Sequence, residues 1–171
     1  MIFVAPEFWS AQRCEGVRAA IGRAELSRAE IFVTDYCVDE GVRRTFEADV
    51  DPDIVREAEE SIAAARPLVA EFYGVALVGS EGPAFLRYPP GGFYRAHRDC
   101  LAESDEEFPR RISVVLFVTD ACEGGTLRIY GRSVHDIHPR AGTLVAFPAA
   151  WLHEVLPVTA GVRDAIVDWF Y

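Results

Sequence analysis

Two side chains with metal-binding chemistry lie two residues apart in the sequence, at His97 and Asp99. In an extended strand, residues i and i+2 point to the same side, so this imidazole and this carboxylate can reach one point. The pair alone is weak evidence, because a surface histidine beside a carboxylate gives the same pattern. A second histidine, His153, follows the apolar run GTLVAFP and supplies a candidate third ligand on a later segment.

Two histidines and one carboxylate on one face of an octahedral metal form the facial triad of non-haem Fe(II) oxygenases. This geometry leaves three adjacent coordination positions, of which a 2-oxo acid takes two and dioxygen takes the third. The set His97, Asp99 and His153 therefore predicts an iron site in which these three residues are the metal ligands and the catalytic centre.

A 2-oxo diacid also needs a cation for its distal carboxylate, and arginine offers bidentate geometry for that role. The chain contains no lysine, and its 17 basic residues are all arginine. Arg163 lies in the last predicted strand, where strand alternation places it on one face with Ala165 and Trp169. The alternative for Arg163 is a surface ion pair with Asp164 or Asp168.

The elements that must position these residues change in character at about residue 74. Residues 10–21 have the apolar spacing of a helix. A second helix is predicted from Asp51, an N-cap residue followed by proline, to Gly74, a typical helix stop. Pro67 is expected to kink or split this helix. A β-like run at residues 31–34 lies between the two helices.

From residue 75 onward, short apolar runs alternate with separators rich in Gly, Pro and Asp. The runs are VALVG, PAFLRY, GFYRAHRD, RISVVLFVTD, GTLRIYG, GTLVAFP and VRDAIVDWFY. This pattern predicts an antiparallel sandwich or jelly roll. Because ISVVLFV is apolar at every position except Ser113, both of its faces should be covered, one of them by the helices. We therefore expect a single domain, 1–171, with helical support at 1–74 and a jelly-roll core at 75–171.

Length and composition are those of an ordinary globular domain with a real core. No apolar run is long enough to cross a bilayer, and the N-terminus lacks the pattern of a signal peptide. We therefore expect a cytoplasmic protein without a membrane partner. The net charge of −10 disfavours nucleic acid as a partner. The four cysteines have no CxxC spacing and are expected to be free thiols.

Three stretches carry a resemblance to a known family: FLRYPPGGFYRAHRDC, GGTLRIYG and PRAGTLVAFPAAWLHEVLPVTAGVRDAIVDWF. Together and in this order, they closely resemble the prolyl-4-hydroxylase-like branch of the 2-oxoglutarate/Fe(II)-dependent dioxygenases. The resemblance covers about residues 31–171 and is strongest from residue 84. It implies a mostly β fold whose core is a double-stranded β-helix (jelly roll), with the N-terminal helices on the outer face of one sheet. It also implies Fe(II), 2-oxoglutarate and O2, with ascorbate as a candidate reductant.

The resemblance assigns roles to five residues. In the family, the His-x-Asp pair and the distal histidine bind iron, which places the metal on His97, Asp99 and His153. The tyrosine of the R-Y-P segment, Tyr88, is implied to hydrogen-bond 2-oxoglutarate. The basic residue after H-x-V-x-P-V, Arg163, is implied to pair with the distal carboxylate of that co-substrate.

Other positions narrow the reaction. Many relatives carry Ser or Thr two or four residues after the basic residue, where this chain has Ala165 and Val167, so a second anchor is absent or supplied elsewhere, by Tyr88 or a water. Asp99 favours hydroxylation, because halogenases of the superfamily leave the carboxylate position vacant. Trp169 stands where the nucleic-acid demethylase branch has a second arginine, which argues against base repair.

Three further residues are candidate substrate contacts: Tyr94, Arg111 and Trp169. The alternatives are packing for Tyr94, a core position for Trp169 and neutralisation of the preceding acidic loop for Arg111. The family also suggests the extended segment at residues 31–50, with Arg43 and Arg44, as a loop that grips the substrate.

The sequence thus predicts a 2-oxoglutarate- and Fe(II)-dependent dioxygenase that hydroxylates a C–H bond, with a peptidyl proline as its substrate. One alternative is a hydroxylase of a free amino acid or a natural product. Others are a catalytically silent jelly-roll domain for binding or sensing, and a metal-dependent cupin that uses no oxo acid. The expected partner is a protein, a peptide or a small-molecule substrate, and the sequence gives no oligomeric state.

Overall fold

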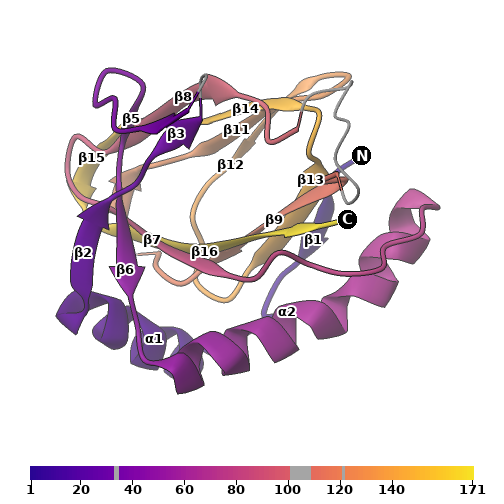
Figure 1. Ribbon diagram of the computed structural model, residues 1–171, viewed down its shortest axis with the longest axis horizontal. Coiled ribbons are helices and arrows are strands. Elements are labelled where there is room, and N and C mark those ends of the chain that lie inside the picture. The colour runs from indigo at the N-terminus through magenta and orange to yellow at the C-terminus, as the bar shows by residue number, and fades with distance from the viewer. Residues whose placement is uncertain (33–34, 101–108, 121) are drawn as a thin grey trace.

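The computed structural model describes residues 1–32, 35–100, 109–120 and 122–171, and its main feature is a pair of antiparallel sheets that face each other (Figure 1). The larger sheet has the strand order β1-β13-β9-β16-β7-β6-β2, and the smaller has the order β12-β11-β14-β8-β5. Neighbouring strands come from distant parts of the chain, as they do in a jelly roll. The predicted fold class, mostly β with a jelly-roll core, is confirmed.

The strands of the larger sheet are β1 (Phe3–Ala5), β2 (Glu25–Arg28), β6 (Phe46–Asp49), β7 (Ala84–Tyr88), β9 (Ile112–Phe117), β13 (Leu144–Pro148) and β16 (Arg163–Phe170). Those of the smaller sheet are β5 (Arg43–Arg44), β8 (Phe93–His97), β11 (Leu127–Tyr130), β12 (Val134–Ile137) and β14 (Leu152–Val155). Two further pairs are β3 (Ile31–Phe32) with β4 (Tyr36–Cys37), and β10 (Cys122–Gly124) with β15 (Val158–Gly161).

Two helices cover the outer face of the larger sheet, as predicted (Figure 1). Helix α1 (Ala11–Arg23) begins after Ser10, whose hydroxyl caps the first turn. Helix α2 (Pro52–Tyr73) has Asp51 as its N-cap and ends at Gly74, where φ is +64° in the left-handed region. Within the described ranges, neither helix is long and apolar enough to cross a membrane.

Helix α2 runs unbroken through Pro67, so the prediction that this proline would split the helix is wrong. Pro67 lies on the exposed side, where the carbonyl that loses its partner, that of Ala63, can bond to water. The packing of the opposite side against the sheet stabilises the helix across the proline. The buried residues of α2 keep helical spacing on both sides of Pro67: Ala58, Ile62, Ala65 and Val69.

One other local prediction differs from the structure, and another falls partly outside the described residues. Residues 75–79 (VALVG) form no strand; the N–H groups of Val78 and Gly79 instead bond to the carbonyl of Tyr171, and Val78 is largely exposed. The predicted run at residues 31–34 is β3 as far as Phe32, and its remainder lies outside the described residues.

The first 74 residues supply strands as well as helices. β1, β2 and β6 extend the larger sheet at both of its edges, and β5 is the edge strand of the smaller sheet. The division into helical support and jelly-roll core stays a prediction, and the part of the chain before residue 75 contributes to both sheets.

Strand β9 is covered on both faces, as predicted from the run ISVVLFV. Ile112, Val114 and Leu116 pack in the cluster between the larger sheet and the helices. Val115 and Phe117 pack in a second cluster between the two sheets, together with residues of β11, β13 and β16. Successive side chains of each strand point alternately into the space between the sheets and away from it. The candidate site lies in this space.

Candidate active site

Three side chains with metal-binding atoms converge between the sheets: His97, Asp99 and His153. His97 ends β8, and His153 is its register partner on the neighbouring strand β14. Asp99 follows β8, and its carboxylate oxygens lie 3.4 Å from the Nε2 atoms of both histidines. The candidate ligand atoms all lie within 4.8 Å of one another. The structure thus brings the three predicted ligands together, and their role as ligands stays a prediction.

Backbone carbonyls fix the orientation of both imidazole rings. His97 Nδ1 lies 2.8 Å from the carbonyl oxygen of Arg95, and His153 Nδ1 lies 3.0 Å from that of Trp151. A carbonyl can only accept, so each neutral ring carries its proton on Nδ1 and presents the lone pair of Nε2. A metal-binding histidine is usually oriented by a hydrogen bond from its other ring nitrogen. In both histidines, a backbone carbonyl two residues earlier in the chain accepts this bond.

Asp99 is oriented by a residue of the larger sheet. Ser113, in β9, donates a hydrogen bond of 2.5 Å to Oδ2 of Asp99, and its side chain is 2 % exposed. In the metal-free site, burial alone would raise the pKa of Asp99, but hydrogen bonds from the imidazoles of His153 and His97, when these carry a proton on Nε2, outweigh it and hold this pKa well below its usual range. The carboxylate is therefore ionised, as a metal ligand must be.

The two histidines differ in their electrostatic environment. Burial lowers the pKa of His97, and the hydrogen bond with Asp99 only partly offsets this. Burial also acts on His153, but interaction with Asp99 is stronger there and raises the pKa of His153. A cation at the centre of the cluster would replace the proton that Asp99 otherwise attracts to His153.

Arg163 is a buried cation that faces the space between the sheets. Its side chain is 2 % exposed, and its Cζ lies 4.7 Å from the ring centre of Tyr88 and 5.2 Å from that of Phe117. Among the described residues, no carboxylate pairs with it, and its Nε is buried without a hydrogen-bond partner. Burial lowers the pKa of Arg163, but a guanidinium stays charged at neutral pH. Arg163 therefore offers a buried N–H donor that no described residue of the protein satisfies.

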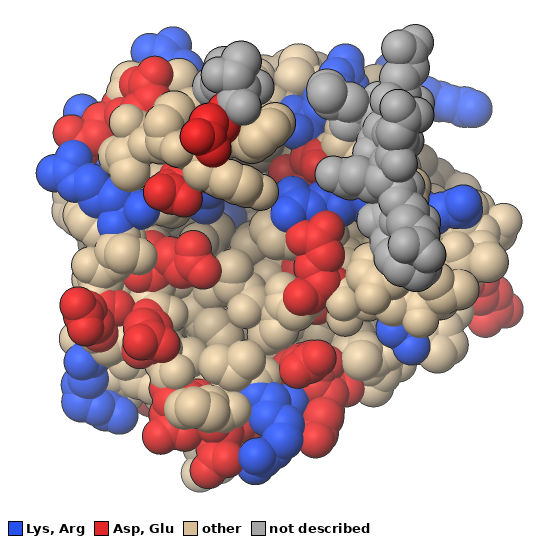
Figure 2. All heavy atoms as spheres, viewed as in Figure 1, with Lys and Arg blue, Asp and Glu red and all other residues tan. Residues whose placement is uncertain are grey.

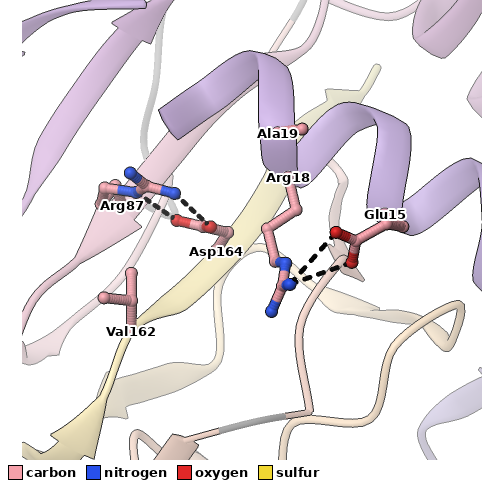
Figure 3. A pocket seen from close by; sticks show the side chains of 6 residues that line it. All are labelled: Glu15, Arg18, Ala19, Arg87, Val162 and Asp164. Atoms are coloured by element: carbon pink, nitrogen blue, oxygen red, sulfur yellow. Dashed lines mark hydrogen bonds and ion pairs between the residues drawn. The ribbon is translucent and has the colours of Figure 1, made fainter. Parts of the chain in front are cut away.

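The two aspartates that could have paired with Arg163 are engaged elsewhere. Asp164 points to the helix side of the sheet, where Arg87 donates two hydrogen bonds of 2.8 and 2.7 Å to it. Figure 3 shows this pair beside a hollow of about 360 Å³ that is also lined by residues of α1. Asp168 accepts hydrogen bonds from the N–H groups of Gly82 and Trp169. The surface ion pair is thus excluded as the explanation for Arg163.

The implied contact of Tyr88 with 2-oxoglutarate stays a prediction, and the structure shows where the residue lies. It is the register partner of Arg163 on β7, is 2 % exposed and shares the inter-sheet space. Ala165 is fully buried on the same face as Arg163, and Val167 packs near Tyr88, so neither position offers a polar group. Tyr88 is therefore a hydroxyl-bearing neighbour of the Arg163 guanidinium, with its ring centre 4.7 Å from Cζ.

Tyr94 is turned toward the site by an irregularity in β8. The register moves from His97 opposite His153 to Tyr94 opposite Val155, so three steps on β8 match two on β14. This is a β-bulge, and it places Tyr94 and His97 on one side although they are three residues apart. Their rings stack with centres 3.6 Å apart. Simple alternation would have placed Tyr94 on the opposite face.

The cation nearest to the ring of Trp169 in the described contacts is Arg110. Its Cζ lies 3.8 Å from the ring centre of Trp169, and its guanidinium makes a bidentate pair with Glu81. Asp99 is close enough to raise the pKa of Arg110, although burial and Glu81 have larger effects on it. Arg111, predicted as a substrate contact, is exposed at the start of β9 and stays a prediction.

Sequence reasoning missed Ser113, Arg110 and Phe147, whose ring meets that of His153 edge to face at 4.8 Å. Ser113 carried a signal, because it is the only polar residue inside ISVVLFV, and a polar residue in a buried strand needs a partner. Arg110 and Phe147 had none, since their contacts depend on the path of segments that the sequence pattern does not fix.

The residues present fit both Fe(II) and 2-oxoglutarate. Two neutral imidazoles and one ionised carboxylate are the donor set of the facial triad. Arg163, with its buried and unpartnered Nε, fits an anionic oxygen. Phe117 and Phe147 belong to one inter-sheet cluster and contact Arg163 and His153, respectively, so both halves of the site border the same enclosed space.

Comparison with known proteins gives the same class. Residues 83–171 match the 2OG-Fe(II) oxygenase superfamily. A PKHD-type hydroxylase of Aliarcobacter butzleri is 30 % identical over 99 % of this chain and 77 % of its own length. One of Stenotrophomonas maltophilia is 40 % identical over 51 % of this chain, and that match spans 41 % of the relative. The crystal structure of a Pseudomonas putida prolyl-4-hydroxylase has a TM-score of 0.79 and 26 % identity, covering 99 % of this chain and 91 % of that one.

The chain therefore belongs to the 2OG-Fe(II) oxygenase superfamily. Within it, the chain is similar to PKHD-type hydroxylases in sequence and to a prolyl-4-hydroxylase in structure.

Proposed function

We propose that the chain hydroxylates a C–H bond with Fe(II), 2-oxoglutarate and O2, and that its substrate is a prolyl residue in a peptide or protein. The observation that carries the proposal is the buried Arg163, a cation to which no described carboxylate is paired, in the same space as His97, Asp99 and His153. The substrate class is supported by the names of the relatives, PKHD-type hydroxylase and prolyl-4-hydroxylase.

His97, Asp99 and His153 would hold Fe(II) through the two Nε2 atoms and the carboxylate. When bound, Fe(II) with 2-oxoglutarate and O2 supplies the oxidising power for C–H hydroxylation, with succinate and CO2 as co-products. The backbone carbonyls of Arg95 and Trp151 keep both imidazoles in the binding tautomer. Asp99 supports hydroxylation over halogenation, because a carboxylate stands in the position that a halide would need.

Arg163 would pair with the distal carboxylate of 2-oxoglutarate, and Tyr88 would hydrogen-bond the same molecule. Since Ala165 and Val167 offer no hydroxyl, the guanidinium carries most of the binding energy for that carboxylate. The apolar wall around it, which includes Phe117, excludes water and strengthens the ion pair.

Tyr94 and Trp169 would line the mouth through which the substrate enters. Tyr94 stacks on His97, and Arg110 covers Trp169. Both rings therefore have a fixed orientation before the substrate arrives, which reduces the entropy lost on binding. We retain Arg111 as a candidate substrate contact beside them.

The test is to incubate purified protein with Fe(II), ascorbate, 2-oxoglutarate and a panel of proline-containing peptides. Succinate and a gain of one oxygen on a peptide are measured by mass spectrometry. His97→Ala should abolish both, because the metal loses a ligand. His135→Ala is the matched control, since His135 lies on β12 and bonds only to Ser133 among the described residues.

Succinate no higher than that of His97→Ala would contradict the proposal and favour a silent binding or sensing domain. Succinate formed with amino acids or natural products, but with no peptide, would favour the alternative substrate class. Full activity of Arg163→Ala would favour a metal-dependent cupin without an oxo acid. Ascorbate as reductant, the single-domain organisation and a cytoplasmic location stay predictions.

A further inference from the structure

The edge formed by β5 and β8 carries arginines that pair with no aspartate or glutamate that the structure describes. Arg43 and Arg44 form β5 and lie opposite Tyr94 and Phe93 of β8, and Arg95 follows in β8. Within the described part of the chain, none of these three arginines forms an ion pair with an aspartate or glutamate.

The net charge of the chain is −10, so acidic side chains outnumber basic ones. Figure 2 shows acidic and basic side chains interspersed over one face of the molecule, so partners are plentiful on the surface. Elsewhere arginines do pair with carboxylates: Arg13 with Glu57, Arg18 with Glu15, Arg28 with Glu40, Arg56 with Asp53 and Arg128 with Asp136. Arg43, Arg44 and Arg95 form no ion pair with a described carboxylate, so their guanidinium groups can bind an anionic group of another molecule.

The three arginines do not share one face. Arg43 stacks on Tyr94 with its Cζ 4.6 Å from the ring centre, whereas Arg44 and Arg95 both lie 5.8 Å from Phe93. Successive strand residues point to opposite faces, so Arg43 lies on the face of Tyr94, and Arg44 lies on the other. Of the two arginines of β5, only Arg43 is on the face of the active site.

Arg43 is held close to the proposed iron site. One face of the Tyr94 ring stacks on His97 at 3.6 Å, and Arg43 lies 4.6 Å from the same ring. Its Nη1 donates a hydrogen bond of 2.8 Å to the carbonyl of Glu30, which fixes the guanidinium. Its Nε is buried without a partner among the described residues. A buried N–H without an acceptor is destabilising, and an oxygen of a bound molecule would satisfy it.

The neighbouring surface fits a peptide better than a small acid. Phe32 and Tyr36, on the β3–β4 pair that follows Glu30, are 66 % and 67 % exposed, and their rings meet edge to face at 5.3 Å. Large exposed aromatic side chains beside an active site are typical of a surface that binds an extended partner. A free amino acid bound near His97 would leave these rings uncovered.

We propose that Arg43 binds a carboxylate of the substrate, so that the preferred substrate is a peptide segment with Asp or Glu close to the hydroxylated residue. This rests on the proposed function and adds to it the charge of the substrate. The guanidinium donates to the carboxylate while its flat face remains on Tyr94, so the contact is a charge-assisted hydrogen bond in a partly desolvated position.

The experiment compares two fluorescein-labelled peptides that differ only in charge. Both have a central proline; one is flanked by Asp and Glu, and the other by Asn and Gln at the same positions. Binding to the Fe(II)- and 2-oxoglutarate-loaded protein is measured without oxygen, by fluorescence anisotropy at low salt. The acidic peptide should bind about tenfold more tightly to the unaltered protein. Arg43→Gln should reduce that preference to within about twofold, and Arg43→Lys should keep part of it.

Arg44→Gln is the matched control, because it removes the same charge from the next residue, on the other face of the strand. It should keep the preference for the acidic peptide. Equal binding of both peptides to the unaltered protein, or an equal loss of preference in Arg44→Gln and Arg43→Gln, would overturn the proposal. So would competition by N-acetyl-aspartate at the same concentration as the peptide, since the carboxylate would then come from a small molecule.

Binding without oxygen separates this proposal from the proposed function. A protein that makes no succinate but keeps the Arg43-dependent preference contradicts the enzymatic function and supports the charge selection. A protein that makes succinate but binds both peptides equally supports the enzymatic function and contradicts the charge selection. In oxygen, Arg43→Gln should raise the KM of the acidic peptide about tenfold with little change in kcat, because the contact is made equally in the bound and reacting states.

Discussion

Arg163 is a residue at which the needs of stability and binding oppose each other. A buried guanidinium without a paired carboxylate is destabilising by itself. Arg163→Met keeps the volume and removes the charge, so we expect it to raise the free energy of unfolding of the metal-free protein by about 1 to 3 kcal/mol. The same change should abolish the stabilisation that added 2-oxoglutarate gives to the metal-loaded protein. Urea unfolding and thermal shift measure the two effects.

Arg132→Met is the control for this substitution, because Arg132 is exposed in the turn between β11 and β12. It should change neither quantity. If Arg163→Met destabilised the metal-free protein, the guanidinium would have a partner in the fold, and its assignment as an anchor for an external anion would be wrong.

Ser113 provides a second test at the level of one atom. Its hydroxyl donates to Oδ2 of Asp99, and Ser113→Ala leaves the carboxylate without that contact. Loss of such a supporting hydrogen bond typically weakens metal binding by about 10- to 100-fold. We expect this loss in a titration with Fe(II) or Co(II), while urea unfolding of the metal-free protein changes by only about 1 kcal/mol. Unchanged metal affinity would show that Asp99 is oriented by its backbone alone.

The sequence predicted some of these residues better than others. Residue type and strand alternation predicted that His97, Asp99 and Arg163 would face one space. The alternation holds for His97 in β8 and Arg163 in β16, whereas Asp99 lies just beyond the end of β8. Tyr94 was a candidate, but strand alternation did not predict the face on which it lies, because the bulge in β8 reverses that face. The contact between Arg110 and Trp169 joins two segments far apart in the chain, and no local pattern predicts which of two adjacent arginines makes it.

At the level of elements, the register between β7 and β16 links the two faces of the larger sheet. Arg163 lies opposite Tyr88 on the inner face, and Asp164 lies opposite Arg87 on the outer face. The bidentate pair of Arg87 with Asp164 therefore fixes the same strand positions that bring Tyr88 next to Arg163 (Figure 3). A contact on the helix side thereby holds Tyr88 and Arg163 in register on the inner face.

The two halves of this pair should respond differently to removal. The side chain of Asp164 is 1 % exposed and that of Arg87 is 20 % exposed. Arg87→Met leaves a buried carboxylate without a partner and should lower the free energy of unfolding by about 3 kcal/mol. Asp164→Asn leaves an arginine that can reach water and should cost about half as much. Chemical denaturation of both variants decides this, and an equal loss would show that both charges are equally hydrated.

Element boundaries show where local patterns fail. Both helices were predicted, and α2 ends at Gly74 as expected, because caps act within a few residues. The continuity of α2 through Pro67 and the absence of a strand at residues 75–79 depend on packing against the sheet and on the partner of each backbone group. Likewise, β2 and β6 are strands only because the edge of the larger sheet accepts them.

At the level of the whole molecule, the larger sheet separates two environments. Its inner face carries the candidate site, and its outer face packs on the helices. Asp168, in β16, is fully buried, and its Oδ2 has no partner among the described residues. Burial raises the pKa of Asp168 to about 6, and the nearby Glu81 and Glu59 add to this. This carboxyl makes the stability of the fold depend on pH, independently of His97, Asp99 and His153.

The direction of that dependence follows from proton binding. The folded state holds the Asp168 proton more tightly than the unfolded state, whose pKa is near the ordinary 3.8, so this group stabilises the fold most below that value. The contribution is lost as pH rises through about 6, and above it the ionised carboxylate destabilises the fold by on the order of 2 kcal/mol.

Asp168→Asn keeps an oxygen for the N–H groups of Gly82 and Trp169 but cannot ionise. It should therefore be more stable than the unaltered protein at pH 8, with the gain shrinking toward pH 5. Urea unfolding of both metal-free proteins from pH 5 to pH 8 measures the difference, in which the titration of His97, Asp99 and His153 cancels. A difference that stayed constant over this range would show that Asp168 is already ionised throughout it.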